Sequence, residues 1–129
     1  MEYRFDAAAR YTRTHEWVRV EGGEAAIGVS DYAQHSLSDV VFVEVPGPGS
    51  PLVREKPFTV IESVKAAEDV IAPVTGTVTA KNAHLEKEPE LVNKDPFGEG
   101  WLVRVTLSDA KELDALMDAA AYRKYVESL

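Results

Sequence analysis

Cysteine is absent from this chain of 129 residues. Its absence excludes a disulfide scaffold, a thiolate nucleophile, an iron–sulfur cluster and every zinc motif that depends on cysteine. Thiol or disulfide chemistry at a site of this protein would therefore require a group that is attached to the chain.

Long apolar runs are also absent. The longest tight cluster of aliphatic and aromatic residues is 40–43 (VVFV), far short of the roughly 20 residues that a membrane-spanning helix needs. Residues 1–10 mix charged and apolar side chains, unlike the uninterrupted apolar stretch of a secretory signal. We therefore expect no membrane segment and a cytoplasmic location.

Basic residues are fewer than acidic ones. The chain has 14 Lys and Arg against 22 Asp and Glu, which gives a formal net charge of −8. A nucleic acid would meet net repulsion instead of a basic footprint, so we expect proteins or small cations as partners and no nucleic acid. With 45% hydrophobic and 28% charged residues, the composition is that of a soluble globular protein, and the length suits a single domain over 1–129.

Strand patterns dominate the first two thirds of the chain. Residues 17–20 (WVRV) alternate apolar and charged side chains, and a Gly-Gly pair separates them from 25–29 (AAIGV), which predicts a hairpin. Prolines and glycines punctuate 40–93 too densely for a long helix, so we expect short strands and hairpins there. Residues 1–10 are expected to be loose.

Two segments carry signals for helices. Asp31, with Gln34 three residues later, predicts the capped start of a short helix. The last good strand pattern is 101–107 (WLVRVTL). After it, Asp109 begins a second capped segment with apolar residues at helical spacing, which predicts a C-terminal helical cap over 109–127.

The middle of the chain repeats itself weakly. Residues 53–57 (VREKP) match 85–89 (LEKEP) at a displacement of 32 positions, and the same displacement sets Val60 against Val92. Two half-units of a few short strands each would pair into one small barrel or sandwich, since neither could bury its apolar face alone. Chance similarity between two Lys/Glu-Pro turns is the alternative.

Enzyme motifs are incomplete. Residues 15–19 (HEWVR) begin like the zinc-binding H-E-x-x-H helix but end in arginine. Residues 28–32 (GVSDY) lack the second glycine of the G-x-S-x-G nucleophile elbow. We find no combination of nucleophile, base and orienting group. The histidines are scattered and are expected to be surface or structural residues: His15, His35 and His84.

One lysine lies at the junction of the two half-units. Residues 62–69 (ESVKAAED) join them, and a hairpin turn there would project Lys65 away from the protein. Its small neighbours, Ser63, Ala66 and Ala67, would leave it open to another protein. An exposed lysine on a turn is otherwise an ordinary solvated charge, and the spacing alone leaves both interpretations open.

Residues 62–66 (ESVKA) resemble the lipoylation motif of the glycine cleavage system H protein family, in which Lys65 takes the position of the lipoyl-bearing lysine. Four further segments are similar to that family: 14–17 (THEW), 27–34 (IGVSDYAQ), 39–46 (DVVFVEVP) and 90–101 (ELVNKDPFGEGW). Lipoyl domains of 2-oxo-acid dehydrogenase complexes are shorter and lack the first strand and the C-terminal helices. Biotin carriers usually flank the lysine with methionines, where this chain has Val64 and Ala66.

The resemblance implies a mainly β fold, the barrel-sandwich hybrid of two pseudo-symmetric half-units, with a short helix on the N-terminal side and C-terminal helices. It also implies a carrier with no enzymatic activity and a lipoyl group on Lys65. In the family, this group takes an aminomethyl group from the P protein, a pyridoxal-phosphate-dependent glycine decarboxylase. The T protein, an aminomethyltransferase, receives the one-carbon unit, and the L protein, dihydrolipoyl dehydrogenase, reoxidises the dithiol.

The resemblance further implies a pocket for the loaded arm, formed by Thr14, Glu16 and Asp69, with Ser36 where some relatives carry histidine. A groove that excludes water and offers a carboxylate would hold a protonated amine and protect it from hydrolysis. The lipoate ligase or lipoyl transferase would recognise the turn through Glu62 and Glu68. All these carboxylates could instead be ordinary surface charges.

Two alternatives to this carrier function stay open at the level of the sequence. One is an H-like protein that relays lipoate to other complexes. The other is a binding module in which Lys65 is never modified. If Lys65 is acylated, the missing cysteines acquire a second meaning, because a native thiol nearby could be trapped by the lipoyl disulfide through exchange. Acylation would also remove one positive charge, which favours steering towards basic partner surfaces.

Overall fold

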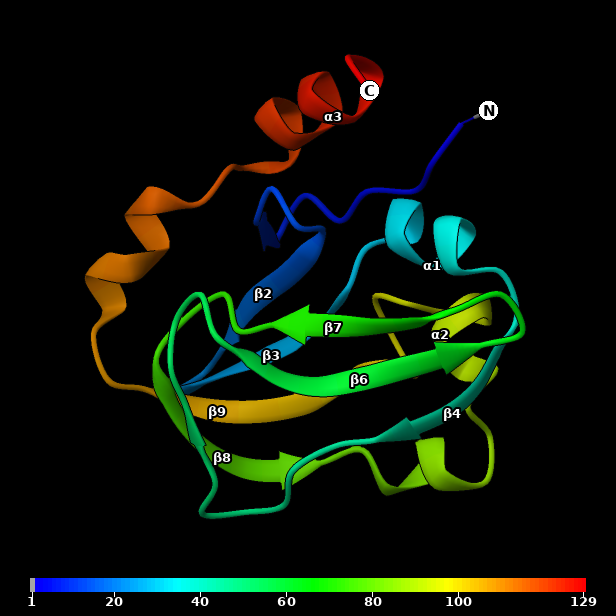
Figure 1. The fold of residues 1–129 in the computed structure, drawn as a ribbon. Helices are drawn as coiled ribbons and strands as arrows, with labels where there is room; N and C mark the ends of the chain where they lie inside the picture. The colour runs from blue at the N-terminus through cyan, green and yellow to red at the C-terminus, as the bar shows by residue number, and fades with distance from the viewer. Residues whose placement is uncertain (1) are drawn as a thin grey trace.

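The larger of two antiparallel sheets has six strands in the order β1-β2-β3-β9-β8-β5 (Figure 1). The computed structural model describes residues 2–129. Glu21 pairs with Glu24 across the turn between the second and third strands, which confirms the hairpin predicted at the Gly-Gly pair. The six strands are β1 (Arg10–Tyr11), β2 (Glu16–Glu21), β3 (Glu24–Val29), β5 (Pro51–Leu52), β8 (Gly76–Lys81) and β9 (Val103–Leu107).

The smaller sheet has three strands in the order β4-β6-β7. They are β4 (Val40–Glu44), β6 (Pro57–Ser63) and β7 (Ala67–Ile71). Glu62 pairs with Ala67, so the short turn that joins β6 to β7 carries Lys65 at its tip, as predicted. Side chains from both sheets meet in the main apolar core, among them Val18 and Ile61. The mainly β, two-sheet architecture is therefore confirmed.

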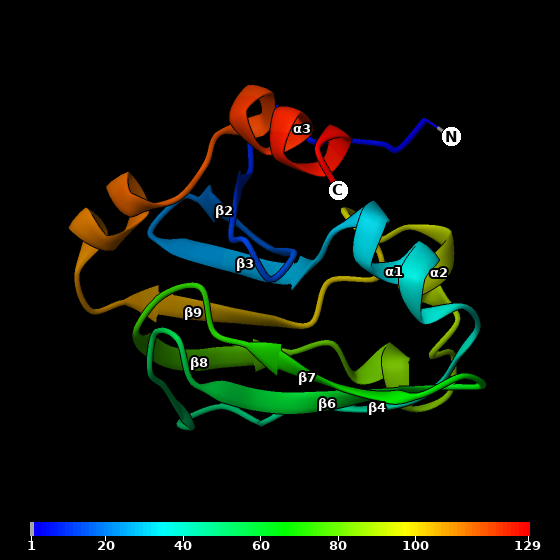
Figure 2. The same ribbon diagram turned by 45° about the horizontal axis from the view of Figure 1, so that its top comes forward.

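Neighbouring residues of β2 belong to different cores. Val18 joins the main core between the sheets, whereas Trp17 joins a second core on the other face of the larger sheet. This division follows from the strand itself, in which successive side chains point to opposite faces. The second core includes Tyr11 and Tyr122 and is covered by α3 (Ala119–Glu127) and the N-terminal segment. Figure 2 shows the resulting layers, with α3 above β2 and β3 and the smaller sheet on the far side.

The helix α1 (Asp31–Leu37) is capped one residue earlier than predicted. The N-cap is Ser30, whose Oγ accepts a hydrogen bond from the Ala33 amide at 3.1 Å. Ser30 has the extended backbone of the strand end (φ −73°, ψ 167°), which the N-cap requires, and Asp31 is already helical. Asp31 and Gln34 still interact, because Gln34 Nε2 donates to Asp31 Oδ1 at 2.7 Å.

The remaining helices are short, and two of them interrupt the segment expected to contain only strands. In the described part of the chain, the four remaining helices are η1 (Ala83–Glu86), α2 (Leu91–Lys94), η2 (Ala110–Ala115) and α3, and the two that interrupt that segment are η1 and α2. The predicted helical cap over 109–127 is divided, because Met117 pairs with Tyr11 through two backbone hydrogen bonds of 2.8 and 3.0 Å between η2 and α3. Asp109 caps the first part as predicted, and Asp118 caps the second. Within residues 2–129, none of the helices has the length and apolarity needed to cross a membrane.

The expectation of a loose start over 1–10 is corrected for the residues that the structure describes there; residue 1 lies outside them. Arg4 binds the buried carboxylate of Asp31 twice, through its backbone amide at 2.8 Å and its guanidinium at 2.9 Å. Phe5 packs edge-on against Tyr122 at a centroid distance of 5.8 Å, and Ala9 is buried. The segment is held because it covers the second core and supplies the cation for Asp31.

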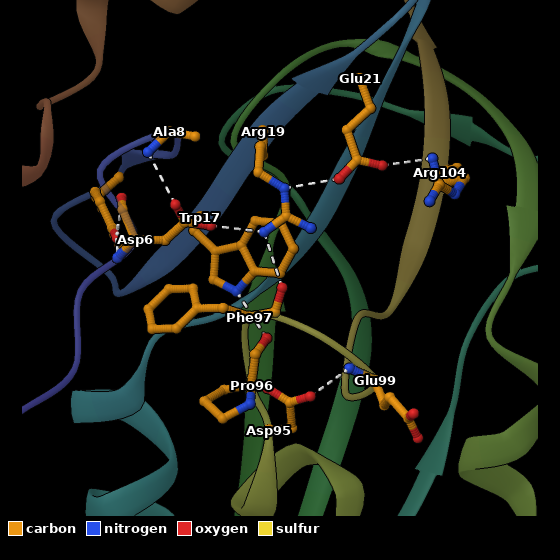
Figure 3. A network of polar contacts seen from close by, with 11 residues as sticks. Asp6, Ala8, Trp17, Arg19, Glu21, Asp95, Pro96, Phe97, Glu99 and Arg104 are labelled. Carbon is orange, nitrogen blue, oxygen red and sulfur yellow. Dashed lines mark hydrogen bonds and ion pairs between the residues drawn. The ribbon is translucent and has the colours of Figure 1, made fainter.

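A network of polar contacts closes the outer edge of that core (Figure 3). Trp17 is fully buried, and its indole N–H donates to the Pro96 carbonyl at 3.0 Å. The Arg19 guanidinium stacks over the Trp17 ring, donates to the Phe97 carbonyl at 2.8 Å and pairs with Asp6 at 2.7 Å. The network thus ties the N-terminal segment and the loop before β9 to β2.

The weak repeat at a displacement of 32 positions does not correspond to equivalent structure. Val60 lies on β6 and is 41% exposed, whereas Val92 lies in α2 and is fully buried. Val53 is likewise exposed, and its match Leu85 is buried in η1. A Lys/Glu-Pro turn can precede a strand or a helix, so the shared letters reflect similar turns only.

Candidate functional site

A cavity of about 330 Å³ lies beside the turn that carries Lys65. Four parts of the chain form it: the segment before and at the start of β2, the end of β3, the helix α1, and the β6–β7 hairpin. The packing of the two sheets on one core places these parts together, although they are far apart in the sequence. Its apolar wall consists of Val29, Ala33, Leu37, Ile61 and Val70.

The turn that carries Lys65 is fixed by its own polar groups. The Ser63 amide donates to the Ala66 carbonyl at 2.8 Å, and Ser63 Oγ accepts from the amides of Lys65 and Ala66 at 3.2 and 3.1 Å. The Val64 amide donates to the Asp39 carbonyl at 2.9 Å, which anchors the turn to the segment between α1 and β4. The Lys65 side chain is exposed and reaches the cavity, where Nζ donates to the Ser36 carbonyl at 3.2 Å. A stiff turn therefore presents a long side chain at the edge of a cavity.

Glu16 is a buried carboxylate in the cavity wall, with 2% of its surface exposed. Its Oε1 accepts from Thr12 Oγ1 at 2.7 Å and from Thr14 Oγ1 at 2.5 Å, and its Oε2 accepts from the Ile71 amide at 3.1 Å. Burial raises the pKa of this carboxyl, and these hydrogen bonds offset the effect only in part. Within residues 2–129 no cation pairs with Glu16, and a carboxylate with three donors retains a free acceptor position.

The cavity brings together most of the residues that the resemblance singled out. Thr14, Glu16, Ser36 and Asp69 all line it, together with Lys65 and Glu68. Asp69 and Glu68 are exposed residues of β7, whereas Glu16 is buried. Ser36 contributes a backbone carbonyl to Lys65.

Glu62 lies outside this cavity. It pairs with Phe42 across β4 and β6 and lines a shallow depression with Phe42, Val60 and Glu44. It is exposed, as is Phe42. The two glutamates that flank the lysine turn therefore belong to different surfaces, with Glu68 at the cavity and Glu62 on the sheet.

His15 is a cavity residue that the sequence pattern did not identify. Its backbone has a left-handed conformation (φ 76°), which is uncommon outside glycine, and its Nδ1 lies 2.8 Å from the Tyr122 hydroxyl. Burial lowers the pKa of its imidazole. The only local signal was its position next to Glu16, because its partner lies 107 residues further along the chain.

The arrangement fits a chain-like apolar group that ends in a cation. The apolar wall would contact hydrocarbon, and the carboxylates of Glu16 and Asp69 would attract positive charge. A group joined to Lys65 Nζ would start at the cavity edge, and acylation of that nitrogen would remove the charge that otherwise favours solvent.

Comparison with known proteins agrees with this geometry. A family model described as "Glycine cleavage H-protein" matches residues 9–129. A protein of Haloarcula marismortui named "Probable glycine cleavage system H protein" is 52% identical over 118 residues, which cover 92% of this chain and 93% of that protein. The "Glycine cleavage system H protein" of Halorhodospira halophila is 51% identical over 118 residues, which cover 91% of each. The crystal structure of a glycine cleavage system H protein from Mycobacterium marinum superposes with a TM-score of 0.84 at 28% sequence identity, covering 95% of this chain and 97% of that chain. The chain belongs to the glycine cleavage H-protein family.

Proposed function

We propose that Lys65 carries a lipoyl group in amide linkage and that the protein serves glycine cleavage as a carrier rather than as an enzyme. It takes an aminomethyl group at the P protein, delivers it to the T protein and presents the dithiol to the L protein. When bound, a lipoyl group supplies the disulfide that accepts the aminomethyl group and the dithiol that is reoxidised. The absence of cysteine suits this function, since no native thiol competes in disulfide exchange.

One observation carries the proposal. Lys65 projects from a stiff, exposed turn, yet its Nζ lies 3.2 Å from the Ser36 carbonyl at the edge of a cavity with an apolar wall and a buried carboxylate. A lysine that serves only as a solvated charge needs no such cavity. An attached arm, by contrast, needs an exposed attachment point that partner enzymes can reach. It also needs a nearby surface on which it can lie when no partner enzyme is bound.

The chain's own residues would hold the arm and its cargo. The apolar wall that includes Val29, Leu37 and Ile61 would cover the hydrocarbon and exclude water. Glu16 and Asp69 would attract the protonated amine, and Thr14 would keep the Glu16 carboxylate in place through its hydrogen bond to Oε1. The tether would keep the local concentration of the reactive group high at each docked partner.

Recognition by a lipoate ligase or lipoyl transferase is part of the same proposal. Glu62 and Glu68 are both exposed and flank the turn on different surfaces. An enzyme that binds both carboxylates would fix the position of the turn on its surface, so that Lys65 alone enters its active site. Replacing either glutamate by glutamine should slow lipoylation without changing the fold.

Intact-mass measurement tests the attachment. The wild-type chain is incubated with lipoate, ATP and a lipoate ligase, in parallel with Lys65→Arg and the matched control Lys56→Arg, which changes an exposed lysine at the other end of the hairpin. We expect one added lipoyl group in the wild type and in Lys56→Arg, and none in Lys65→Arg. No added mass in the wild type, with a ligase that modifies an authentic substrate, would instead identify an unmodified binding module.

A further inference from the structure

The hydroxyl of Tyr122, a residue of the second core, forms hydrogen bonds with two segments that lead to the cavity. Tyr122 lies on α3, is fully buried, and stacks on Tyr11 with a centroid distance of 4.3 Å. Its hydroxyl oxygen lies 2.8 Å from His15 Nδ1 and 2.7 Å from Ser30 Oγ. The C-terminal helix therefore contacts, through one atom, both the segment before β2 and the N-cap residue of α1.

Both hydrogen-bond partners of Tyr122 belong to segments that form walls of the cavity. His15 lines it and is followed by Glu16, the buried carboxylate of its wall. Ser30 caps α1 by accepting from the Ala33 amide, and α1 supplies Ala33, Ser36 and Leu37 to the opposite wall. The Tyr122 hydroxyl is thus a shared anchor for two walls that contribute to the site from separate elements.

The hydrogen bonds around this hydroxyl have one arrangement that gives the protons of both hydroxyls, Tyr122 and Ser30, an acceptor. Ser30 Oγ already accepts from the Ala33 amide, and its own proton can go to the Tyr122 oxygen. Tyr122 then donates to His15 Nδ1, which must be unprotonated. The reverse order, with His15 donating to Tyr122 and Tyr122 to Ser30, would leave the proton of the buried Ser30 hydroxyl without an acceptor in this chain of bonds.

We propose that Tyr122 is a positioning residue of the cavity: its hydroxyl holds His15 as the neutral tautomer with the proton on Nε2 and ties the segment before β2 to the start of α1. The consequence for the cargo rests on the function proposed above, whereas the tautomer does not. Through this contact the C-terminal helix sets the shape of a cavity that it does not itself line.

The surroundings of His15 agree with a neutral ring. The imidazole packs against Tyr32 of α1 at 4.5 Å and against Tyr125 of α3 at 5.9 Å between ring centroids, and burial lowers its pKa. The charged groups of the neighbouring segments are the adjoining Glu16, whose carboxylate is held by its own donors, and Arg13, which lies over the Tyr125 ring. From the β6–β7 hairpin, Lys65, Glu68 and Asp69 line the same cavity as His15. Among the described residues, the hydrogen-bond partner of Nδ1 is the Tyr122 hydroxyl, and none of these charged groups donates to it.

Nuclear magnetic resonance of the unmodified protein tests the tautomer. Two-bond proton–nitrogen correlations should give His15 an unprotonated Nδ1 and a protonated Nε2 in the wild type. Tyr122→Phe should raise the pKa of His15, because the donor that favours neutral Nδ1 is lost, and should let both tautomers appear. Tyr125→Phe, on the same helix and in contact with the same ring, should leave both readouts unchanged. A protonated Nδ1 in the wild type, or an identical His15 titration in Tyr122→Phe, would overturn the proposal.

A second measurement links the hydroxyl to the cavity. Lipoylated Tyr122→Phe, loaded with the aminomethyl group, should release it about three- to tenfold faster than the wild type, the change expected for losing one hydrogen bond that orders a wall. The lipoylation rate should be unchanged, because the hydrogen bonds that fix the Lys65 turn come from Ser63, Ala66 and Asp39 and none of them involves Tyr122. Unchanged release, together with the expected His15 shift, would refute the link to the cavity. Failure of lipoylation in the wild type would refute the proposed function while leaving the tautomer result intact.

Discussion

Gly28 lies directly opposite Trp17 in the β2–β3 hairpin, and the indole occupies the space that a Cβ at Gly28 would need. Such a Cβ would lie 2.7 to 2.8 Å from three atoms of the indole. The ring cannot retreat, because it is fully buried and its N–H is bonded to the Pro96 carbonyl. This contact packs the β2–β3 hairpin against the second core. Trp17 directly follows Glu16, so the contact also lies next to the cavity wall in the chain.

Gly28→Ala should therefore lower the free energy of unfolding by about 1 to 3 kcal/mol, the usual range for an overpacked site. The matched control is Gly23→Ala in the turn of the same hairpin, where a Cβ would meet nothing within 4 Å. Urea denaturation monitored by tryptophan fluorescence gives both values. Equal stabilities of the two variants would contradict the packing described for Trp17.

The buried carboxyl of Glu16 should make stability depend on pH. Burial raises its pKa in the folded chain, so between the ordinary glutamate pKa and the raised value the folded state binds more protons than the unfolded state. In that pH window the free energy of unfolding of the wild type should fall as the pH rises. Glu16→Gln, which has no carboxyl at this position, should not show this contribution to the fall. Denaturation series of both proteins across the window measure the difference. Parallel pH profiles would show that the carboxyl is not perturbed.

Arg4 should hold the N-terminal segment through Asp31. Burial alone would raise the pKa of Asp31, but hydrogen bonds from Arg4 and Gln34 outweigh it and lower that pKa. Arg4→Met should reduce the free energy of unfolding by about 1 to 3 kcal/mol above the ordinary aspartate pKa. This loss should shrink as the pH falls through the lowered pKa of Asp31, because the wild type then loses the same contribution.

Hydrogen exchange provides the local readout for the Arg4 substitution. Amides of residues 2–9 should exchange faster in Arg4→Met than in the wild type, since the guanidinium contact to Asp31 of α1 is lost and only the backbone amide bond of residue 4 remains. Arg54→Met is the matched control, because among residues 2–129 the Arg54 side chain makes a single polar contact, a 3.8 Å ion pair with the exposed Glu55. Equal protection of residues 2–9 in the two variants would mean that aromatic packing, and not Arg4, holds the segment.

Local patterns were sufficient for the features that depend on neighbouring residues. The Gly-Gly hairpin and the turn at Lys65 follow from alternation and turn residues within about ten positions. The helix cap was displaced by one residue, because Ser30 and Asp31 are both good caps and only the backbone conformation decides between them. The repeat failed because similar turns precede a strand in one case and a helix in the other.

The site was predictable only through the resemblance to a family. Thr14 is an exposed residue before β2 and Asp69 an exposed residue of β7, and no periodicity places them in one cavity. The contact between His15 and Tyr122 spans 107 positions, and it depends on α3 crossing the second core. The N-terminal segment was expected to be loose for a related reason, since its partner Asp31 is buried only after the sheets assemble.

The central claim is that the cavity beside Lys65 holds the cargo of a lipoyl arm, and the rate at which loaded protein releases the aminomethyl group tests it most directly. The lipoylated wild type is compared with Asp69→Asn, which removes a cavity carboxylate, and with Asp114→Asn, which makes the same change at an exposed position outside the cavity. We predict release about two- to fivefold faster in Asp69→Asn, as expected for losing one partly solvated charge interaction, and unchanged release in Asp114→Asn. Equal release rates in all three proteins would contradict the account.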